Sequence, residues 1–247
     1  MTKYLPAILL LLFSGTVLGQ PNQSKQADSI LREIENFEAQ TLGMLPIGWY
    51  NQKGDKQPYT YTGKLREGYM YSIAEEAGNK FLRYEGGSAK HLTYPLADKS
   101  EINIHETPIL SWKWRVHELP KGANEKKESI NDAAASIYVA FDLGRVALFK
   151  KVPKSIRYTW SSSLKEGEEF SKFFGNQKVV VVASGEDELG KWIQFERNIY
   201  EDYKRLFGKK PPKTPLAILI LSDANSTGSY AKADYDDIVL KAASSSN

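Results

Sequence analysis

The chain is dominated by short runs of residues that suit β-strands, each bounded by Gly, Pro, Asn, Asp or Ser. The clearest runs are "ILSWKWRVH", "ASIYVAFDL", "SIRYTWSSS", "KVVVVASG", "KWIQFER", "LAILILSD" and "DYDDIVLKA". Many short strands with few helices are typical of two sheets that bury one face against each other. We therefore predict a mainly β fold, a two-layer antiparallel β-sandwich of jelly-roll type with one or two short helices.

Three further elements are predicted from local signals. "GYMYSIAEE" and "KFLRYEG" flank the turn-rich "AGN" and indicate a hairpin. In "RNIYEDYKRLFGKKPP", Asn198 suits a helix N-cap and Gly208 a helix end, and the two prolines that follow prevent resumption. Residues 27–40 have apolar spacing that fits a helix, but "IENFEAQ" equally fits the opening of a strand, so this element stays ambiguous.

The first residues resemble a secretory signal. Lys3 supplies a positive charge, "LPAILLLLF" is apolar and "SGTVLG" offers small residues, with cleavage expected after Gly19. The apolar run is too short for a permanent transmembrane helix, and we expect no membrane span. We predict a periplasmic or secreted protein, divided into a signal peptide (1–19), a partly disordered segment (20–44), a single β-sandwich domain (45–241) and a tail (242–247).

Charge and cysteine content exclude several function classes. The chain has 247 residues, a formal net charge of +3 and no Cys. That balance gives no reason to expect nucleic-acid binding, which requires a clustered basic face, and the lack of thiols excludes disulfides and thiolate metal sites. The mixed-sign runs "KEGEEFSK" and "KGANEKKES" are expected to be solvated loops.

Two tryptophans two residues apart raise the question of a sugar-stacking platform. On a strand, Trp112 and Trp114 share a face with Leu110 and Val116, because successive side chains point to opposite sides. An exposed platform usually places an aromatic ring among polar neighbours. The pattern therefore favours burial of both rings in the core, with the platform as the alternative.

The opposite faces of these strands are polar. If they belong to one sheet, they form a single surface suited to a polyhydroxylated or acidic ligand, with guanidinium groups for carboxylates, carboxylates for hydroxyls and an aromatic for a ring face. The candidate ligand-binding residues are Lys113, Arg115, Asp132, Tyr138, Arg157, Trp192 and Glu196. The alternative is a solvated sheet face crossed by ion pairs.

Two catalytic arrangements are compatible with these residues. A glycoside hydrolase needs two carboxylates, for which Asp132 and Glu196 are the candidates. A lyase needs a cation and a Tyr or His base, which Tyr138, His117 and either Arg115 or Arg157 would supply. The three His residues have no zinc-ligand spacing, and there is no nucleophile-elbow or phosphate-loop motif.

The segment "DANSTGSYAKAD" has the spacing of an EF-hand calcium loop. Asp223, Asn225 and Thr227 alternate, Gly follows, and Asp234 takes the twelfth position, so calcium is a possible cofactor. A polar β-turn, in which Asp and Asn bond their own backbone, explains the same residues.

Several motifs in the same order resemble a family of exported bacterial proteins, the domain of unknown function 3047. They are "LSWKWRVHELPKGANEKKESINDAAASIYVAFD", "RYTWSSS", "FERNIYEDYKRLFGKKPP" and "LSDANSTGSYAKADYDDIVL", within residues 45–240. The resemblance implies a jelly-roll sandwich similar in style to galactose-binding-like modules, and no established activity. Members often carry a paired Asp where this chain has Asn131 and Asp132, which puts a role for such a pair in doubt here.

The sequence thus favours an exported carbohydrate-binding or cell-envelope-associated protein that binds a polysaccharide or oligosaccharide on a polar sheet face. The alternative is a polysaccharide-degrading enzyme, a hydrolase with Asp132 and Glu196 or a lyase with Tyr138 and Arg115. The residues name neither a particular glycan nor an oligomeric state, and a protein partner in the envelope stays open.

Overall fold

The computed structural model describes residues 31–51, 70–142, 145–146 and 150–243. The predicted signal peptide lies outside these residues. The strands are β1 (Leu31–Glu35), β2 (Tyr50–Asn51), β3 (Tyr71–Glu76), β4 (Asn79–Gly86), β5 (Lys90–Pro95), β6 (Ile109–Glu118), β7 (Ala133–Asp142), β8 (Arg145–Val146), β9 (Lys150–Lys151), β10 (Lys154–Ser161), β11 (Glu169–Lys172), β12 (Gln177–Ser184), β13 (Ile193–Asn198), β14 (Ala217–Asp223) and β15 (Ala231–Lys241). The helical elements are α1 (Ile199–Phe207) and two single 3-10 turns, η1 (Glu128–Ile130) and η2 (Phe173–Gly175).

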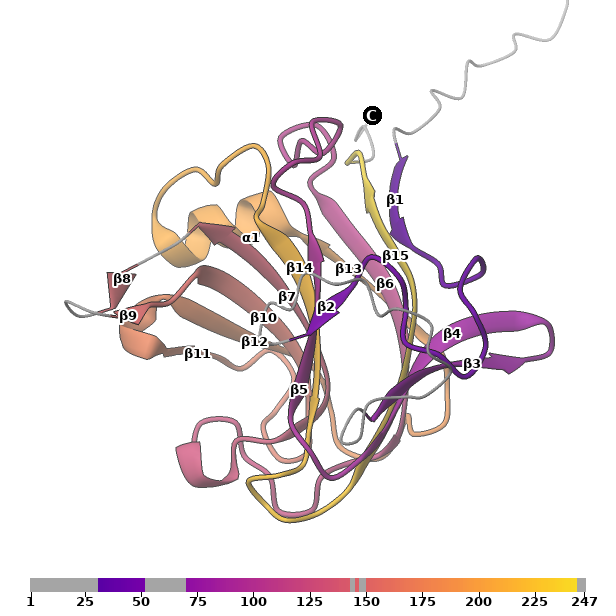
Figure 1. Cartoon of the computed structure of the whole chain (residues 1–247). Coiled ribbons are helices and arrows are strands. Elements are labelled where there is room, and N and C mark those ends of the chain that lie inside the picture. Colours follow the sequence, from indigo (N-terminus) through magenta and orange to yellow (C-terminus); the bar gives the residue numbers. More distant parts are fainter. Residues whose placement is uncertain (1–30, 52–69, 143–144, 147–149, 244–247) are drawn as a thin grey trace, which may run out of the picture.

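Two sheets pack face to face as a jelly-roll β-sandwich, as predicted (Figure 1). Sheet A has the order β13-β6-β15-β4-β3, with β1 also paired to β15, and sheet B has the order β11-β12-β10-β7-β14-β5-β2. Strand pairing is antiparallel except between β10 and β12, which run parallel because β11 connects them. The pair β8–β9 stands apart from both sheets.

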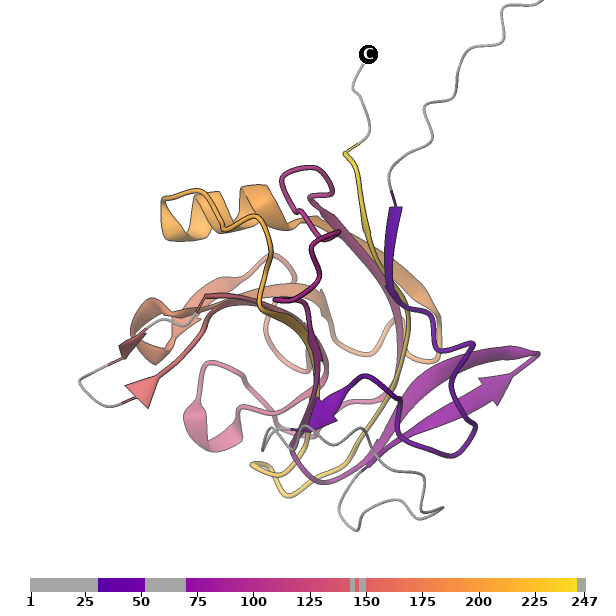
Figure 2. The ribbon, with the colours of Figure 1, turned by 45° about the horizontal axis from the view of Figure 1, so that its top comes forward.

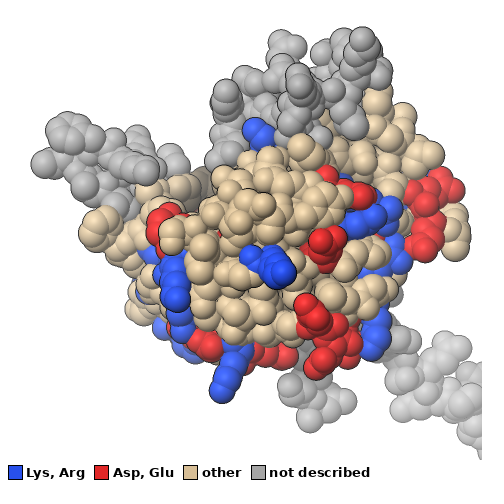
Figure 3. All heavy atoms as spheres, turned by 90° about the horizontal axis from the view of Figure 1, so that it is seen from below, with Lys and Arg blue, Asp and Glu red and all other residues tan. Residues whose placement is uncertain are grey.

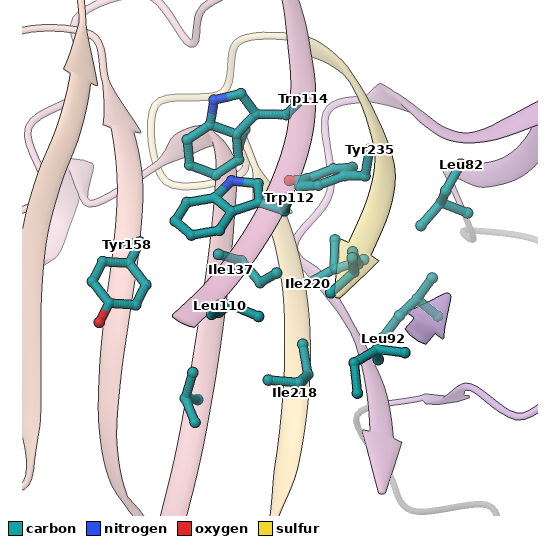
Figure 4. Close-up of a cluster of buried hydrophobic side chains, with 14 of the residues drawn as sticks. Leu82, Leu92, Leu110, Trp112, Trp114, Ile137, Tyr158, Ile218, Ile220 and Tyr235 are labelled. Atoms are coloured by element: carbon teal, nitrogen blue, oxygen red, sulfur yellow. The ribbon is translucent and has the colours of Figure 1, made fainter. Parts of the chain in front are cut away.

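The core lies between the sheets and contains both tryptophans of β6. Trp112 and Trp114 are fully buried, and they meet side chains from β7, β10, β14 and β15 (Figure 4). Trp112 stacks on Tyr158 of β10 with ring centroids 5.6 Å apart. Both rings also contact Phe195 of β13. The core interpretation of the tryptophan pair is confirmed.

The ambiguous N-terminal segment forms a strand. β1 runs beside β15 in both views of the ribbon (Figures 1 and 2). Ile34 and Phe37 are buried in the core, so the packed part of the chain begins before residue 45. Tertiary packing against sheet A decides between the two conformations that the local spacing allowed.

The hairpin and the late helix form as the sequence predicts. β3 and β4 are joined by Ala77 and Gly78, both with positive φ, the geometry of a tight two-residue turn. In α1 the Asn198 side chain accepts a hydrogen bond from the Glu201 amide at 3.0 Å, and Gly208 ends the helix at φ 70°. The helix buries Tyr203 against Phe141 of β7 and covers one end of the core.

The outer surface carries both signs of charge. Seen from below, basic and acidic side chains are interspersed without an extended patch of one sign (Figure 3). In the part of the chain that the structure describes, no helix has the length and apolarity needed to cross a membrane.

Candidate ligand-binding face

The candidate polar residues are divided between the two sheets. Lys113, Arg115, Trp192 and Glu196 belong to sheet A or its border, whereas Tyr138 and Arg157 belong to sheet B and Asp132 directly precedes β7 of that sheet. The expectation of one common surface therefore does not hold. Asp132 and Glu196, the suggested acid pair of a hydrolase, are not brought together, and Arg115 is not brought to Tyr138.

Arg115 lies in a closed arrangement on the outer face of sheet A. Its guanidinium stacks 4.7 Å from the Trp192 ring and 5.3 Å from the Phe81 ring. Its Nη1 pairs with Glu76 at 2.6 Å, and Nε and Nη2 lie 3.0 and 2.9 Å from a carboxylate oxygen of Asp234. With its nitrogens paired and two aromatic rings in contact with its guanidinium, Arg115 has little capacity left for a ligand.

Asp234 is the centre of the sheet A network. It is fully buried and accepts hydrogen bonds from Arg83 at 2.8 and 3.0 Å, from Arg115, and from the His117 ring at 2.7 Å. Burial alone raises the pKa of Asp234, but the hydrogen bonds and charges of Arg83 and His117 outweigh it and keep that pKa below its usual value. The network has the character of a structural ion cluster that joins three strands.

The remaining sheet A candidates form ordinary surface pairs. Lys113 pairs with Asp237 at 2.7 Å, and both side chains are exposed. Glu196 pairs with Lys241 and accepts a hydrogen bond from Gln194. Exposed pairs of this kind contribute little to stability and define no site by themselves.

Arg157 on the outer face of sheet B has a different environment. It is only 3% exposed, and its Nε donates to Ser136 at 3.0 Å. Its guanidinium lies 5.4 Å from the centre of the Tyr138 ring on the neighbouring strand. Its Nη2 is buried without a hydrogen-bond partner. An unsatisfied guanidinium nitrogen in a protein interior calls for an acceptor that the described residues do not supply.

Tyr138 and His91 extend this polar cluster across the sheet. The rings are 5.9 Å apart and nearly perpendicular, with His91 contributed by β5. Neither side chain has a hydrogen bond to another described residue. Burial and the charge of Arg157 lower the pKa of His91 to about 4, so its ring is neutral at pH 7. Burial raises the pKa of Tyr138 to about 12, so its hydroxyl stays protonated.

Glu125 faces the same cluster from the β6–β7 connection, residues 119–132, which we call the strap. It is fully buried, and its Oε2 accepts from Ser161 on the outer face of β10 at 2.7 Å. Its Oε1 is buried without a hydrogen-bond partner, and burial raises the pKa of its carboxyl. The sequence indicated a solvated loop for "KGANEKKES", and nothing in its mixed charges distinguishes the one carboxylate that is buried.

Asp132 and Asp223 form a carboxyl pair beside this cluster. Asp132 accepts from the amides of Ser226 and Thr227 at 3.1 and 2.7 Å, and from the Thr227 hydroxyl. Burial and a hydrogen bond with Asp132 raise the pKa of Asp223 to about 7. Burial opposes ionisation of Asp132, but its hydrogen bonds from Thr227 and Asp223 lower its pKa. Below about pH 7 the pair therefore holds one proton, on Asp223, beside an ionised Asp132.

The predicted calcium ligands have other partners in the structure. Thr227 binds Asp132, Asp223 accepts from the Asn225 amide at 3.2 Å, and Asp234 points to the Arg cluster on sheet A. The four predicted ligands are therefore not gathered around one point. Among the described residues, no group of three or more His, Asp or Glu side chains is arranged to hold a metal ion.

We define the sheet B site as Glu125, Tyr138, Arg157 and His91. Sequence periodicity identified Tyr138 and Arg157 because both lie on regular strands. It did not identify His91 and Glu125, because their proximity to Tyr138 and Arg157 depends on strand order and on the path of the strap.

Solved structures similar to this chain are sugar-binding and xylanase sandwiches. The family 11 carbohydrate-binding module of a cellulosomal cellulase from Clostridium thermocellum is 13% identical, with a TM-score of 0.40 over 86% of this chain and 95% of the module. SGBP-B from a complex xyloglucan utilization locus in Bacteroides uniformis is 12% identical, with a TM-score of 0.33 over 85% of this chain and 49% of that chain. An ENZbleach xylanase variant is 11% identical, with a TM-score of 0.37 over 82% and 89% of the two chains.

No curated protein matches the chain. A family model described as "Protein of unknown function (DUF3047)" matches residues 24–239, which is most of the sequence and includes every strand of both sheets except the end of β15. The chain therefore belongs to the DUF3047 family, as its motifs suggested.

Proposed function

We propose that this chain is an exported carbohydrate-binding protein whose sheet B site binds a polysaccharide or oligosaccharide. The observation that carries the proposal is the unused hydrogen-bonding capacity of this site. Arg157 Nη2 and Glu125 Oε1 have no partner, and the Tyr138 hydroxyl has no hydrogen bond within the described part of the chain. Sugars present many hydroxyl groups, which both donate and accept hydrogen bonds, and an aromatic ring such as Tyr138 supplies the apolar contact that sugar rings require.

The contrast with sheet A supports this choice of face. There the charged groups are paired with one another, so ligand binding would have to break existing ion pairs. On sheet B, Arg157 Nη2 and Glu125 Oε1 have no hydrogen-bond partner among the described residues, so a ligand gains hydrogen bonds at these two atoms without breaking an ion pair. The proposal therefore assigns ligand binding to Tyr138 and Arg157 and leaves Arg115 a structural role.

The test is a binding assay with the purified mature protein and a panel of neutral and acidic polysaccharides. We expect depletion of the protein from solution by at least one polymer. Tyr138→Phe should weaken that binding several-fold, since it removes one hydrogen bond of about 1 kcal/mol. The matched control is Glu196→Gln, an exposed sheet A variant that should bind like the wild type.

Two results would contradict the proposal. One is a panel in which no polysaccharide depletes the protein. The other is equal binding by Tyr138→Phe and the wild type, combined with loss of binding in the sheet A control.

A second function, polysaccharide elimination, is favoured by one further observation, the neutral His91 ring beside Tyr138 and Arg157. In such a reaction Arg157 neutralises the carboxylate of an acidic sugar, and His91 accepts the proton from C5. The electrons of that C–H bond form the C4–C5 double bond, and the C4–O bond breaks as Tyr138 donates its proton to the departing oxygen.

Mass spectrometry of the same incubations tests this second function. An eliminating enzyme releases oligosaccharides with an unsaturated end, and His91→Gln should abolish their release, whereas the exposed sheet A variant Glu196→Gln should release them like the wild type. Polymer depletion without any released product would contradict elimination and leave the binding function.

A further inference from the structure

Two buried atoms of the sheet B site lack partners and have opposite chemical character. Arg157 Nη2 is a hydrogen-bond donor with positive charge, and Glu125 Oε1 is an acceptor on a carboxyl group. The two side chains are 3% and 0% exposed, so bulk water does not satisfy either atom. Unpaired polar groups this deep are uncommon in folded proteins and require an explanation.

The two atoms do not satisfy each other. No ion pair with a nitrogen–oxygen distance within 4.0 Å joins Arg157 to Glu125 or to any other described carboxylate. Each side chain is held by its other end, Arg157 through Nε to Ser136 and Glu125 through Oε2 to Ser161. The charges are nevertheless near enough for Arg157 to favour the ionised form of Glu125 against the effect of burial. The two groups thus interact through charge without a direct hydrogen bond, and each keeps one buried polar atom for a ligand group.

The chemistry of such a ligand follows from the two atoms. The Arg157 nitrogen takes a strong acceptor, for which a carboxylate is the best partner. The Glu125 oxygen takes a donor, which a sugar hydroxyl supplies. A uronic acid carries both groups on one ring, and the ring itself would lie near the Tyr138 side chain, which is 5.4 Å from the guanidinium. A neutral sugar supplies the donor but only a weaker acceptor.

We infer that the sheet B site binds one uronic acid residue of an acidic glycan, with its carboxylate on Arg157 Nη2 and a ring hydroxyl on Glu125 Oε1. This inference rests on the proposed carbohydrate-binding function and specifies the class of sugar. It also assigns Glu125 a direct role in ligand binding, although it lies on a connection and outside both sheets.

The strap is held beside the site by two hydrogen bonds. Ser163 of the β10–β11 connection donates to the Ala123 carbonyl at 2.7 Å, and Lys172 of β11 donates to the Glu125 carbonyl at 3.2 Å. Glu125 and Arg157 are buried in this arrangement, so binding of a sugar at both atoms requires a local displacement of the residues that cover them. Closure over the ligand then removes water from the charged contact and strengthens it.

The experiment compares acidic oligosaccharides with their carboxyl-reduced counterparts. Isothermal titration calorimetry on the wild-type mature protein would use oligomers of galacturonic, glucuronic and mannuronic acid, each paired with the neutral oligomer in which the carboxylate is reduced to a hydroxymethyl group. We expect at least one acidic oligomer to bind at least about tenfold more tightly than its neutral counterpart, the effect of one charged hydrogen bond. This comparison needs no variant.

Variants then assign the groups. Arg157→Gln should reduce the acidic-to-neutral ratio to near one, whereas Glu125→Gln should weaken both oligomers by a similar factor and leave the ratio unchanged. Lys113→Gln, which removes an exposed cation from sheet A, is the matched control and should leave the ratio as in the wild type.

The outcomes separate this inference from the proposed function. Equal affinity for acidic and neutral oligomers would overturn the uronic acid assignment and leave carbohydrate binding standing. No binding of any oligomer by a folded wild-type protein would overturn both. If Lys113→Gln loses the preference for acidic over neutral oligomers and Arg157→Gln keeps it, the carboxylate binds on sheet A and not on sheet B.

Discussion

At the scale of single residues, Arg115 and Arg157 show how neighbours decide the role of one side-chain type. Both are buried arginines on outer sheet faces, and the sequence treats them alike. Arg115 meets Asp234 and Glu76, while Arg157 meets a hydroxyl and an aromatic ring and keeps a free nitrogen. The first arginine therefore stabilises the fold, and the second is available to a ligand.

Asp223 gives a residue-scale prediction about pH. Its pKa is about 7 in the folded protein and about 3.9 for an unperturbed Asp, so between these values the folded state binds more protons than the unfolded state. The stability contribution of Asp223 therefore falls as pH rises through this window, by up to about 1.4 kcal/mol per pH unit. In Asp223→Asn the amide still donates a hydrogen bond toward Asp132 but does not titrate. The free energy of unfolding of this variant should therefore fall less than that of the wild type between about pH 5 and about pH 8.

Urea unfolding at several pH values measures this difference. Glu125 and Asp236 also have raised pKa values, so the comparison of Asp223→Asn with the wild type isolates the contribution of Asp223. The control is Asp237→Asn, which changes an exposed acid. Identical pH profiles for Asp223→Asn and the wild type would show that Asp223 does not hold this proton.

Trp114 gives a prediction about the core. It is fully buried and contacts the rings of Trp160, Phe195 and Tyr235. Trp114→Ala should lower the free energy of unfolding by about 3 to 5 kcal/mol, the usual cost of truncating a buried aromatic. Chemical denaturation measures the change. If the variant were as stable as the wild type and had lost only sugar binding, Trp114 would belong to a sugar-binding platform and not to the core.

At the scale of elements, the outer face of sheet A is a set of cross-strand ion pairs. Asp234 in β15 lies directly opposite Arg83 in β4 and Arg115 in β6, so one carboxylate on the middle strand joins its two neighbours. Directly opposed charges of opposite sign stabilise a sheet, and burial makes the loss of one partner costly. The sequence shows the charges, but only the strand order places them in one row.

Asp234→Asn tests this element. The substitution keeps the size of the side chain and leaves two arginines near it without their carboxylate, so we expect a loss of about 3 to 5 kcal/mol in the free energy of unfolding. Binding by the folded fraction should be unchanged, because the sheet B site lies on the other sheet. A decrease of less than about 1 kcal/mol in the free energy of unfolding would mean that the cluster contributes no more than an exposed ion pair.

At the scale of the whole molecule, the first and the last strand of the described chain pair with each other in sheet A. β1 pairs with β15, and Phe37 directly after β1 is fully buried against Trp49, with ring centroids 6.2 Å apart. The contact joins residues far apart in sequence, so forming it costs loop-closure entropy that the packing of β1 and Phe37 has to offset. The N-terminal strand is therefore an integral part of the sandwich.

Phe37→Ala tests this role. Loss of the buried ring should lower the free energy of unfolding by about 3 to 5 kcal/mol, measured by urea denaturation. The exposed Phe174 offers a matched control, because Phe174→Ala removes the same ring from solvent and should change stability by less than about 0.5 kcal/mol. If both variants changed the free energy of unfolding by a similarly small amount, the N-terminal segment would contribute little to the stability of the fold.

The sequence by itself determined the features that depend on local pattern. Period-two alternation assigned Trp112 and Trp114 to the core, and the cap and glycine signals placed α1. These features are predictable because a strand alternates its faces and a helix end needs specific partners, whatever the rest of the chain does.

Only the tertiary structure decided the site. Strand order separated Arg115 from Arg157, brought His91 beside Tyr138 across β14, and laid the strap so that Glu125 faces β10. It also chose a strand for residues 31–35, where the local spacing fitted two conformations. Contacts between residues distant in sequence depend on how sheets pair and pack, and a local pattern specifies which side of a strand a residue occupies but not which strand lies next to it.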